Sequence, residues 1–185
     1  MPAFRRSVSW RILGRMSLAE VLGCRLHAPN PLQRAVQTVA ATRTGSVVFS
    51  RTLPTLDNLA QRLTGRTLPE VFAALPVVQL TTTGRRSGQP RTSHLVAIPH
   101  ESGLGVIGTN FGQPETPAWV LNLEADPHAT VAHRGVTADV VARPASPAER
   151  DLIYALADRT YDGYRAYRQR ITDREVRVFV LEPVG

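Results

Sequence analysis

The spacing of apolar residues divides the chain into a helical first part and a strand-rich second part. From Leu32 the apolar positions recur with a helical period. A second helical stretch begins near Thr55, which can cap it, and ends at Gly65. A short helix is expected over residues 68–74, and the β-branched, apolar run at 77–83 is typical of a strand.

The second part predicts short strands joined by tight turns, with helices among them. The expected strands lie at residues 77–83, 91–99, 104–109, 128–133, 136–143 and 175–181. One helix begins at Pro117, capped by Thr116, and ends near residue 125. Another follows Ser146, whose spacing to Glu149 is that of a capping box. Five or six mostly hairpin-linked strands with flanking helices indicate an α+β fold with a small closed or half-closed β-barrel.

Residues 1–30 stand apart as a basic N-terminal extension. Arginines are interleaved there with apolar residues such as Trp10 and Ile12, and Met16 offers a second start. This pattern fits an amphipathic helix on an anionic membrane surface, but it also fits a loosely held chain end without fixed structure. We therefore expect a flexible or amphipathic segment at 1–30, followed by one domain at 31–185.

The net charge is concentrated at the N-terminal end. All 22 basic residues are arginine, and the formal net charge is +7. Residues 1–56 hold eight arginines and one acid, Glu20, whereas residues 57–185 hold fourteen basic and fourteen acidic residues. The body of the protein is therefore neutral, and this balance argues against a nucleic-acid-binding surface.

Other classes of protein are excluded by the apolar runs and the cysteine count. No uncharged apolar run reaches the roughly 18 residues that a membrane-spanning helix needs. Charges also interrupt the apolar stretch that a secretory signal requires. Cys24 is the only cysteine, and the histidines lack metal-ligand spacing, so neither an internal disulfide nor a metal is expected. We expect a cytoplasmic protein, at the inner face of the cell membrane if residues 1–30 bind lipid.

One segment combines a sharp turn with clustered arginines. It reads Leu-Thr-Thr-Thr-Gly-Arg-Arg-Ser-Gly-Gln-Pro-Arg-Thr over residues 80–92. Arg85, Arg86 and Arg91 have no acid nearby in sequence, and Ser87 adds a hydroxyl. Guanidinium forks and accessible backbone N–H groups are the donors that a phosphate or carboxylate needs. The alternative is a solvated hairpin tip that keeps the strand edge soluble.

A second segment, residues 108–123, also favours an anion. A strand ends there in a loop and a helix follows, so free N–H groups and the positive end of the helix dipole face what the loop encloses. Trp119 and Asn122 share one helix face. The alternatives are core packing for Trp119 and the tying of a loop for Asn122. Two such elements close together favour a phosphorylated ligand.

Tyr161, Tyr164 and Tyr167 repeat every third residue and so stay on one side of a helix or a 3₁₀ turn. Three rings on one side can wall a flat aromatic pocket, and each hydroxyl can donate a hydrogen bond to an oxyanion. The alternative is an aromatic edge packed on the barrel.

Together these segments resemble the deazaflavin-dependent nitroreductase family. The likeness covers the Thr-Thr-Gly-Arg-Arg-Ser-Gly-Gln-Pro-Arg run, the Thr-Asn-Phe-Gly-Gln-Pro and Pro-Ala-Trp-Val-Leu-Asn-Leu runs, the tyrosine segment, and residues 174–181. It extends from residue 32 onward. The resemblance implies a split β-barrel of mostly antiparallel strands, related to flavin-binding barrels. It also implies coenzyme F-420, an anion-rich deazaflavin, as the ligand, with FMN as the less favoured alternative.

The resemblance also implies a set of site residues. Arg85, Arg86 and Ser87 are implied to hold the phosphate or the oligoglutamate tail. The other implied cofactor contacts are Arg91, Thr92, Ser93, His94, Leu95, Val96, Ile107, Gly108, Thr109, Asn110, Ala118, Trp119, Val120, Leu121 and Asn122. Tyr164 is implied to lie beside the deazaflavin ring, with Tyr161 and Tyr167 near the second substrate.

These implications predict an oxidoreductase that passes a hydride from reduced F-420 to a small electrophilic acceptor. The acceptor classes are a quinone, a nitroaromatic and an activated enone, and the three tyrosines are the candidate catalytic residues. A non-catalytic deazaflavin carrier and an FMN enzyme on the same barrel are the alternatives. His94, Val120 and Arg177 depart from the family pattern. His94 is a possible proton donor, although a strand histidine facing solvent or a backbone partner is favoured.

Overall fold

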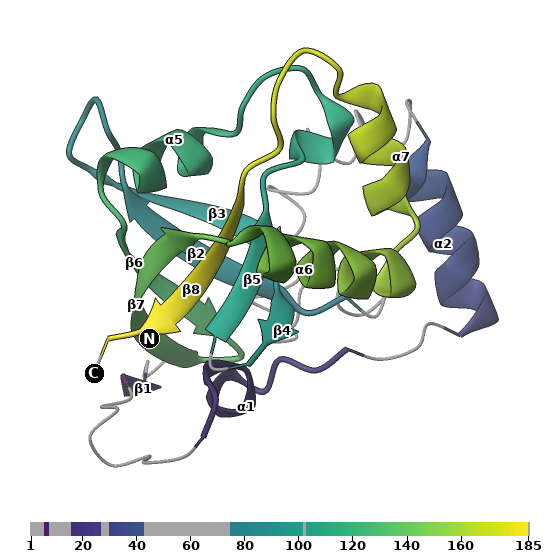
Figure 1. Ribbon diagram of the computed structural model, residues 1–185. Helices are drawn as coiled ribbons and strands as arrows, with labels where there is room; N and C mark the ends of the chain where they lie inside the picture. The colour runs from purple at the N-terminus through teal and green to yellow at the C-terminus, as the bar shows by residue number, and fades with distance from the viewer. Residues whose placement is uncertain (1–5, 8–15, 27–29, 43–74, 102, 185) are drawn as a thin grey trace.

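The computed structural model describes residues 6–7, 16–26, 30–42, 75–101 and 103–184 (Figure 1). The helical stretches expected at 55–65 and 68–74 lie outside these residues. The first predicted helix is confirmed as α2, Pro31–Ala41.

Within the described residues, eight strands form one curled, mostly antiparallel sheet with helices around it. The bounds are β1 Arg6–Ser7, β2 Val77–Thr83, β3 Pro90–Val96, β4 Ile98–His100, β5 Gly103–Ile107, β6 His128–His133, β7 Val136–Pro144 and β8 Val178–Pro183. The strand order is β3-β2-β6-β7-β8-β5-β4, and β1 pairs in parallel with β7. This arrangement confirms the α+β fold with a split β-barrel of mostly antiparallel strands.

Several boundaries differ from the prediction by a few residues; the strand expected at 104–109, for example, is β5, Gly103–Ile107. The expected strand at 91–99 is divided into β3 and β4, because the N–H of Ala97 bonds to Pro76 O between them. The helix α5, Ala118–Ala125, is capped by Pro117 rather than by Thr116, since Pro117 is extended and its carbonyl accepts the first helical bond. The last strand begins at Val178 rather than at residue 175.

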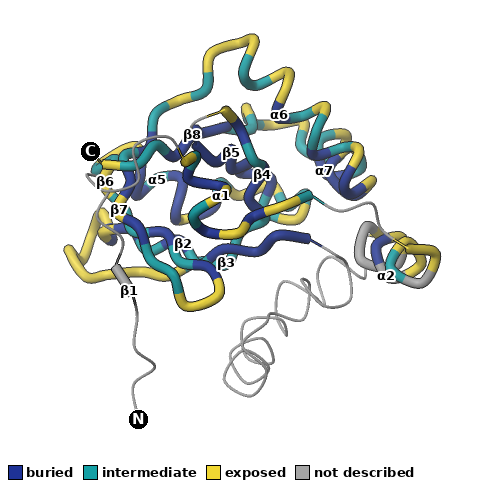
Figure 2. The backbone as a smooth tube through the Cα atoms, turned by 90° about the horizontal axis from the view of Figure 1, so that it is seen from below, coloured by how far each residue is buried: buried dark blue, intermediate teal, exposed yellow. Residues whose placement is uncertain are grey.

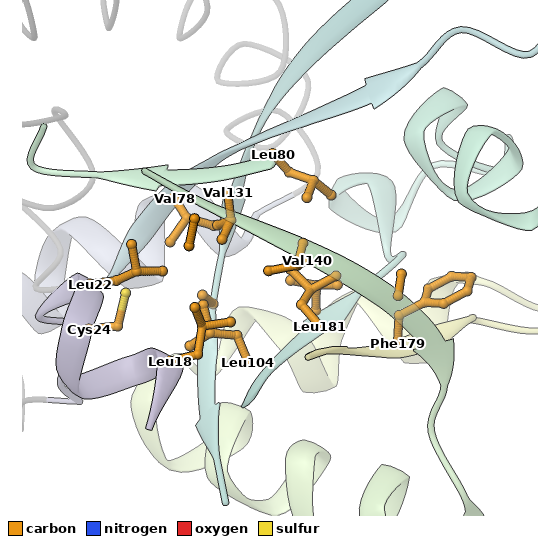
Figure 3. Close-up of a cluster of buried hydrophobic side chains, with 14 of the residues drawn as sticks. Leu18, Leu22, Cys24, Val78, Leu80, Leu104, Val131, Val140, Phe179 and Leu181 are labelled. Carbon is orange, nitrogen blue, oxygen red and sulfur yellow. The ribbon is translucent and has the colours of Figure 1, made fainter. Parts of the chain in front are cut away.

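The first core cluster lies inside the curled sheet and includes α1, Leu18–Leu22 (Figure 2). Leu18 and Leu22 are 0% and 2% exposed, and they lie among barrel residues such as Val78 and Leu181 (Figure 3). This corrects the expectation of a flexible or membrane-lying extension at 1–30 for its described part. Apolar residues at helical spacing there pack into the barrel, and a Ser17–Glu20 capping box starts the helix.

Two further helices cover the other side of the sheet. They are α6, Pro147–Thr160, and α7, Gly163–Arg170, and α2 packs beside α7. The capping box predicted at Ser146 and Glu149 is present at the start of α6. Asp158 on α6 receives a bidentate ion pair from Arg168 on α7, which fixes the two helices against each other. None of the helices in the described ranges is long and apolar enough to cross a bilayer.

Candidate active site

The arginine segment forms a tight turn at the tip of the β2–β3 hairpin, as predicted. The N–H groups of Ser87 and Gly88 both bond to Gly84 O, at 3.0 and 2.7 Å, and Gly88 has a left-handed φ of 64°. Arg85, Arg86 and Ser87 are exposed. Their donors therefore face solvent from a turn whose backbone is held by its own hydrogen bonds.

Asn122 joins this turn to α5. Its Oδ1 accepts the N–H of Arg85 at 3.1 Å, and its Nδ2 donates to the hydroxyl of Thr82 at 3.0 Å. The side chain is buried, and this is the loop-tying alternative considered for Asn122. One side-chain amide therefore joins residues 80–92 to residues 108–123, the two segments whose sequences favour an anionic ligand.

The side chains at the start of α5 have different environments. Trp119 packs edge-on against Phe179 in the core, with ring centroids 6.2 Å apart, and Val120 is fully buried. Both are core residues, whereas Ala118 is exposed and Leu121 is half-buried. The N–H of Val120 already donates to Pro117 O at 3.1 Å, so Val120 has neither an exposed side chain nor a free backbone donor for a ligand.

Strand β3 is the edge of the sheet next to this corner. It pairs only with β2 in the described sheet, and Thr92 shares a hydroxyl contact of 2.9 Å with Thr81. Arg91 and Thr92 are exposed. The half-buried residues of the strand are Ser93, His94, Leu95 and Val96. His94 Nε2 is buried without a hydrogen-bond partner among the described residues, so this edge holds a polar atom that a ligand could satisfy.

The loop after β5 brings the remaining predicted cofactor residues close to α5. Ile107, Gly108 and Thr109 are buried. A Cβ on Gly108 would approach Val120 Cγ2 to 2.8 Å, so the close packing of α5 requires glycine there. Asn110 is half-buried, and its Nδ2 bonds to Glu115 O at 3.0 Å, which closes the loop on itself.

The three tyrosines meet in one buried cluster beside this loop. The hydroxyls of Tyr161 and Tyr167 are 2.7 Å apart, and the three rings make edge contacts with centroids 5.8 to 6.5 Å apart. Each tyrosine is less than 10% exposed, and the ring of Phe111 from the loop lies edge-on against Tyr167. The three rings come together as expected, but they do not share one helix: Tyr164 and Tyr167 lie on α7, whereas Tyr161 is the residue that ends α6. The rings also pack against the barrel, as the alternative interpretation had it.

Burial determines the ionisation of these phenols. It is the main cause that raises the pKa of Tyr161, Tyr164 and Tyr167 above the ordinary value. In the hydrogen-bonded pair, the bond raises the pKa of Tyr161 and lowers that of Tyr167, as expected when Tyr161 donates. All three phenols are therefore protonated at neutral pH, and the proton of Tyr161 lies in its hydrogen bond to Tyr167.

Arg174 was not singled out from the sequence, although it lies in a segment that matched the family pattern. Its guanidinium donates to four backbone carbonyls, those of Gly108, Thr109, Gln113 and Pro114, at 2.9 to 3.2 Å. All four belong to the loop between β5 and α5. No local signal marks such a residue, because its partners lie about sixty positions earlier.

A surface groove also lies between α5, β7 and β8, away from the tyrosines, and Leu123, Arg143 and Arg177 are among its lining residues. Its arginines are already engaged, since Arg143 pairs with Glu149 and Arg177 with Glu124. The donors that suit an anionic ligand are instead at the upper edge of the sheet, where the arginine turn, α5, the β5–α5 loop and α7 follow one another (Figure 1).

Comparison with known proteins identifies the family. Residues 54–183 match the model of the F420H(2)-dependent quinone reductase family. The chain belongs to this family. It is 28% identical over 128 residues to an F420H(2)-dependent quinone reductase of Mycobacterium tuberculosis, which covers 68% of this chain and 85% of the relative. A putatively assigned quinone reductase of Mycobacterium bovis matches to the same extent.

Two solved structures share the fold. An F420-H2-dependent reductase superposes with a TM-score of 0.53 at 31% identity, over 58% of this chain and 94% of that one. A chain described as a domain-swapped dimer gives a TM-score of 0.54 at 26% identity, over 75% and 99% of the two chains. Membership of this quinone reductase family makes the protein an oxidoreductase whose cofactor is coenzyme F-420.

Proposed function

We propose that this quinone reductase family member binds coenzyme F-420 along the β3 edge and transfers a hydride from its reduced form to a quinone. When bound, the reduced deazaflavin supplies the hydride from its C5. The observation that carries the proposal is the Asn122 amide, which holds Arg85 of the arginine turn against α5. The bond supports the proposal because it keeps the exposed donors of the arginine turn next to the start of α5.

The anionic part of the cofactor is assigned to this corner. Arg85 and Arg86 offer exposed guanidinium forks, and Ser87 offers a hydroxyl. The first N–H groups of α5 and its positive dipole end add to these donors. The ring is assigned to the half-buried part of β3 and to Ile107–Asn110. On β3, His94 Nε2 is buried without a hydrogen-bond partner among the described residues, and the ring could supply one.

The acceptor is assigned to the tyrosine end. Hydride arrival builds negative charge on an acceptor oxygen, and a protonated phenol can donate a hydrogen bond to it. Tyr164 is the candidate beside the ring, and the Tyr161–Tyr167 pair at 2.7 Å can pass a proton from one hydroxyl to the other. These residues thereby orient the acceptor, stabilise its charge and return a proton.

The acceptor class is tested by anaerobic turnover. Purified protein is mixed with reduced F-420 and a quinone, a nitroaromatic or an activated enone, and the absorbance of oxidised F-420 is followed. We expect the quinone to be reduced with the highest kcat/KM. A nitroaromatic or enone as the preferred acceptor would overturn the quinone assignment.

The same assay separates the two alternative functions. Binding of F-420 without turnover of any acceptor would indicate a carrier. Purification of a yellow protein that holds FMN would indicate a flavin enzyme. Loss of turnover with retained F-420 binding in a Tyr161→Phe, Tyr164→Phe, Tyr167→Phe variant would support the enzyme.

We further propose that the arginines before α1 contact an anionic membrane, where lipid-soluble quinones dissolve. The proposal rests on Arg5, Arg6, Arg11 and Arg15, which precede the packed helix. Flotation with anionic vesicles tests it, and the truncated protein should begin at Met16 because removal of residues 1–30 would also remove core residues of α1. Equal flotation of the full and the truncated protein would contradict the proposed contact.

A further inference from the structure

We propose that Arg174 is the positioning residue of the site: it fixes the β5–α5 loop between the cofactor strand edge and Tyr167. The inference rests on the function proposed above. Arg174 is not assigned any contact with cofactor or acceptor. It acts through the loop that it holds.

Four of the five N–H donors of the Arg174 guanidinium have a carbonyl partner. Nε donates to Pro114 O at 2.9 Å and Nη1 to Gly108 O at 3.0 Å, while Nη2 donates to Thr109 O and Gln113 O, both at 3.2 Å. Four carbonyls spread over seven residues thus converge on one cation. Lysine has a single nitrogen with three donors and cannot match this geometry.

The cation faces backbone dipoles rather than a carboxylate. Among the described residues, no acidic side chain lies within ion-pair distance of Arg174, and Arg174 is half-buried. Its hydrogen bonds to the loop are all made by main-chain carbonyls, so protonation of a carboxylate does not remove any of them. Burial of the charged guanidinium is unfavourable unless it is hydrogen-bonded. The four carbonyls supply these bonds, and they therefore favour the conformation in which the loop surrounds Arg174.

The loop needs such a support because its backbone is strained. Asn110, Phe111 and Gly112 follow one another with φ values of 49°, 55° and 77°, and only glycine adopts this left-handed region without cost. Strained backbone persists where surrounding contacts over-determine it. The four bonds to Arg174, placed on both sides of these three residues, provide that restraint.

The restraint also decides which way the loop presents its donors. A trans peptide group is planar, so a carbonyl directed at Arg174 turns the following N–H to the opposite side. Thr109 O is bonded to Arg174, and the N–H of Asn110 therefore faces away from the guanidinium. Without the guanidinium, this peptide group would be held only by the bond from the Gly112 N–H to Thr109 O, and the direction of the Asn110 N–H would be less well fixed.

The same loop is the wall against which Tyr167 packs. The ring of Phe111 lies edge-on to that of Tyr167, with centroids 6.2 Å apart. A Cβ on Gly112 would lie 3.2 Å from Tyr167 Cα, so the backbone of the loop touches that of α7. A shift of the loop therefore moves the Tyr161–Tyr167 hydroxyl pair relative to the β3 edge.

The test compares Arg174→Lys, Arg174→Met and the unmodified protein. Amide hydrogen exchange is measured at Gly112 and Gln113, whose N–H groups bond to Thr109 O and Asn110 O. In Arg174→Lys we expect exchange at both to be about tenfold faster, with the β8 amide of Val180 unchanged. We also expect F-420 affinity to fall about tenfold and kcat with a quinone to fall as well. The loop is assigned to the cofactor ring on one side and packs against Tyr167 on the other, so its movement would disturb both. Arg174→Met should do at least as much.

Arg150→Lys is the matched control, because Arg150 is half-exposed and its ion-pair distances are 3.8 and 3.9 Å. It should leave exchange, affinity and kcat as in the parent. If Arg174→Lys folds and matches the parent in amide exchange and F-420 affinity, the proposed restraint of the loop by Arg174, the clamp, is wrong. If the variants do not fold, exchange in the parent decides: Gly112 and Gln113 must be protected about a hundredfold over a free peptide, and unprotected amides would overturn the clamp. A parent that binds no F-420 but whose Arg174→Lys loop exchanges faster would contradict the proposed function and leave the clamp standing.

Discussion

The side-chain carbonyl of Asn122 accepts the backbone N–H of Arg85 at 3.1 Å, and so α5 holds the arginine turn from behind. The bond leaves the Arg85 guanidinium exposed. A turn that is fixed in advance loses less entropy when its arginines bind an anion, and part of the affinity therefore depends on a residue behind the turn.

Asn122→Ala should weaken F-420 binding about tenfold and lower the free energy of unfolding by roughly 1–3 kcal/mol, because it leaves the Arg85 N–H and the Thr82 hydroxyl without this partner. Fluorescence titration and urea unfolding measure the two effects. Thr82→Val is the control: it removes the other bond of Asn122 and keeps the one to Arg85. A similar loss of affinity in both variants would show that Arg85 is not the relevant partner.

Tyr161→Phe should reduce kcat with a quinone by about ten- to a hundredfold while changing the Kd of F-420 less than about twofold, since it removes one hydroxyl of the proton-passing pair and no anion donor. Stopped-flow reoxidation of the bound cofactor measures kcat. Tyr154→Phe is the control. Tyr154 lies on α6 with the Arg168 guanidinium of α7 over its ring, and among the described residues its hydroxyl makes one bond, of 3.5 Å, to Val176 O. Parent-like turnover in Tyr161→Phe would exclude the pair from proton transfer.

The tyrosine cluster should make the protein sensitive to alkali. Burial raises the pKa of Tyr161 and Tyr164 in the folded state, whereas the unfolded chain titrates near 10. The folded state therefore keeps protons that the unfolded state loses, and the free energy of unfolding falls as pH rises above about 10. Urea unfolding between neutral and strongly alkaline pH measures this decline. It should be shallower in Tyr161→Phe, and an unchanged slope would contradict the assignment of the decline to this phenol.

Acid should weaken the junction between β7 and α6. The guanidinium of Arg143 holds Glu149 through bonds of 2.8 and 2.6 Å, and it is the main cause that lowers the pKa of that carboxyl. A lowered folded pKa stabilises the protein above the ordinary glutamate pKa, and this stabilisation is lost as pH falls toward the folded pKa. Glu149→Gln should therefore lower the Tm at neutral pH and flatten the decline of Tm in acid. Asp151→Asn, at an exposed position, should leave the Tm unchanged.

Helix α1 should contribute to stability as a core element. Leu18→Ala removes a fully buried side chain and should cost roughly 2–5 kcal/mol of unfolding free energy. Met16→Ala is the control, since Met16 is 47% exposed. Equal urea midpoints for the two variants would show that α1 is not packed in the barrel.

Local signals were sufficient wherever neighbouring residues define the structure. The Ser146–Glu149 box and the β2–β3 turn were predictable because caps and turns depend on residues within four positions. Long-range contacts were not: the burial of Leu18 depends on barrel strands far along the chain. The bond between Asn122 and Arg85 joins residues 37 positions apart, and the spacing of Asn122 indicated only a helix face.

The candidate site shows the same division. The tyrosine spacing predicted that the rings come together and the arginine run predicted a tight turn, since both depend on one segment, although Tyr161 ends α6 rather than lying on α7. Arg174 could not be chosen from the sequence, because its partners are main-chain carbonyls, which any residue provides. Residue type therefore indicates which chemistry to test, whereas the packing partners required the fold.

The most direct measurement is an equilibrium titration of coenzyme F-420 with the purified protein, followed by cofactor fluorescence. We expect saturable binding at one site per chain in the micromolar range, weakening as salt is raised and weaker again in Arg85→Ala and Arg86→Ala variants. Addition of a quinone to the reduced complex should then restore the absorbance of the oxidised cofactor. Absence of saturable binding, or binding that neither salt nor the two arginine substitutions affect, would contradict the proposed site.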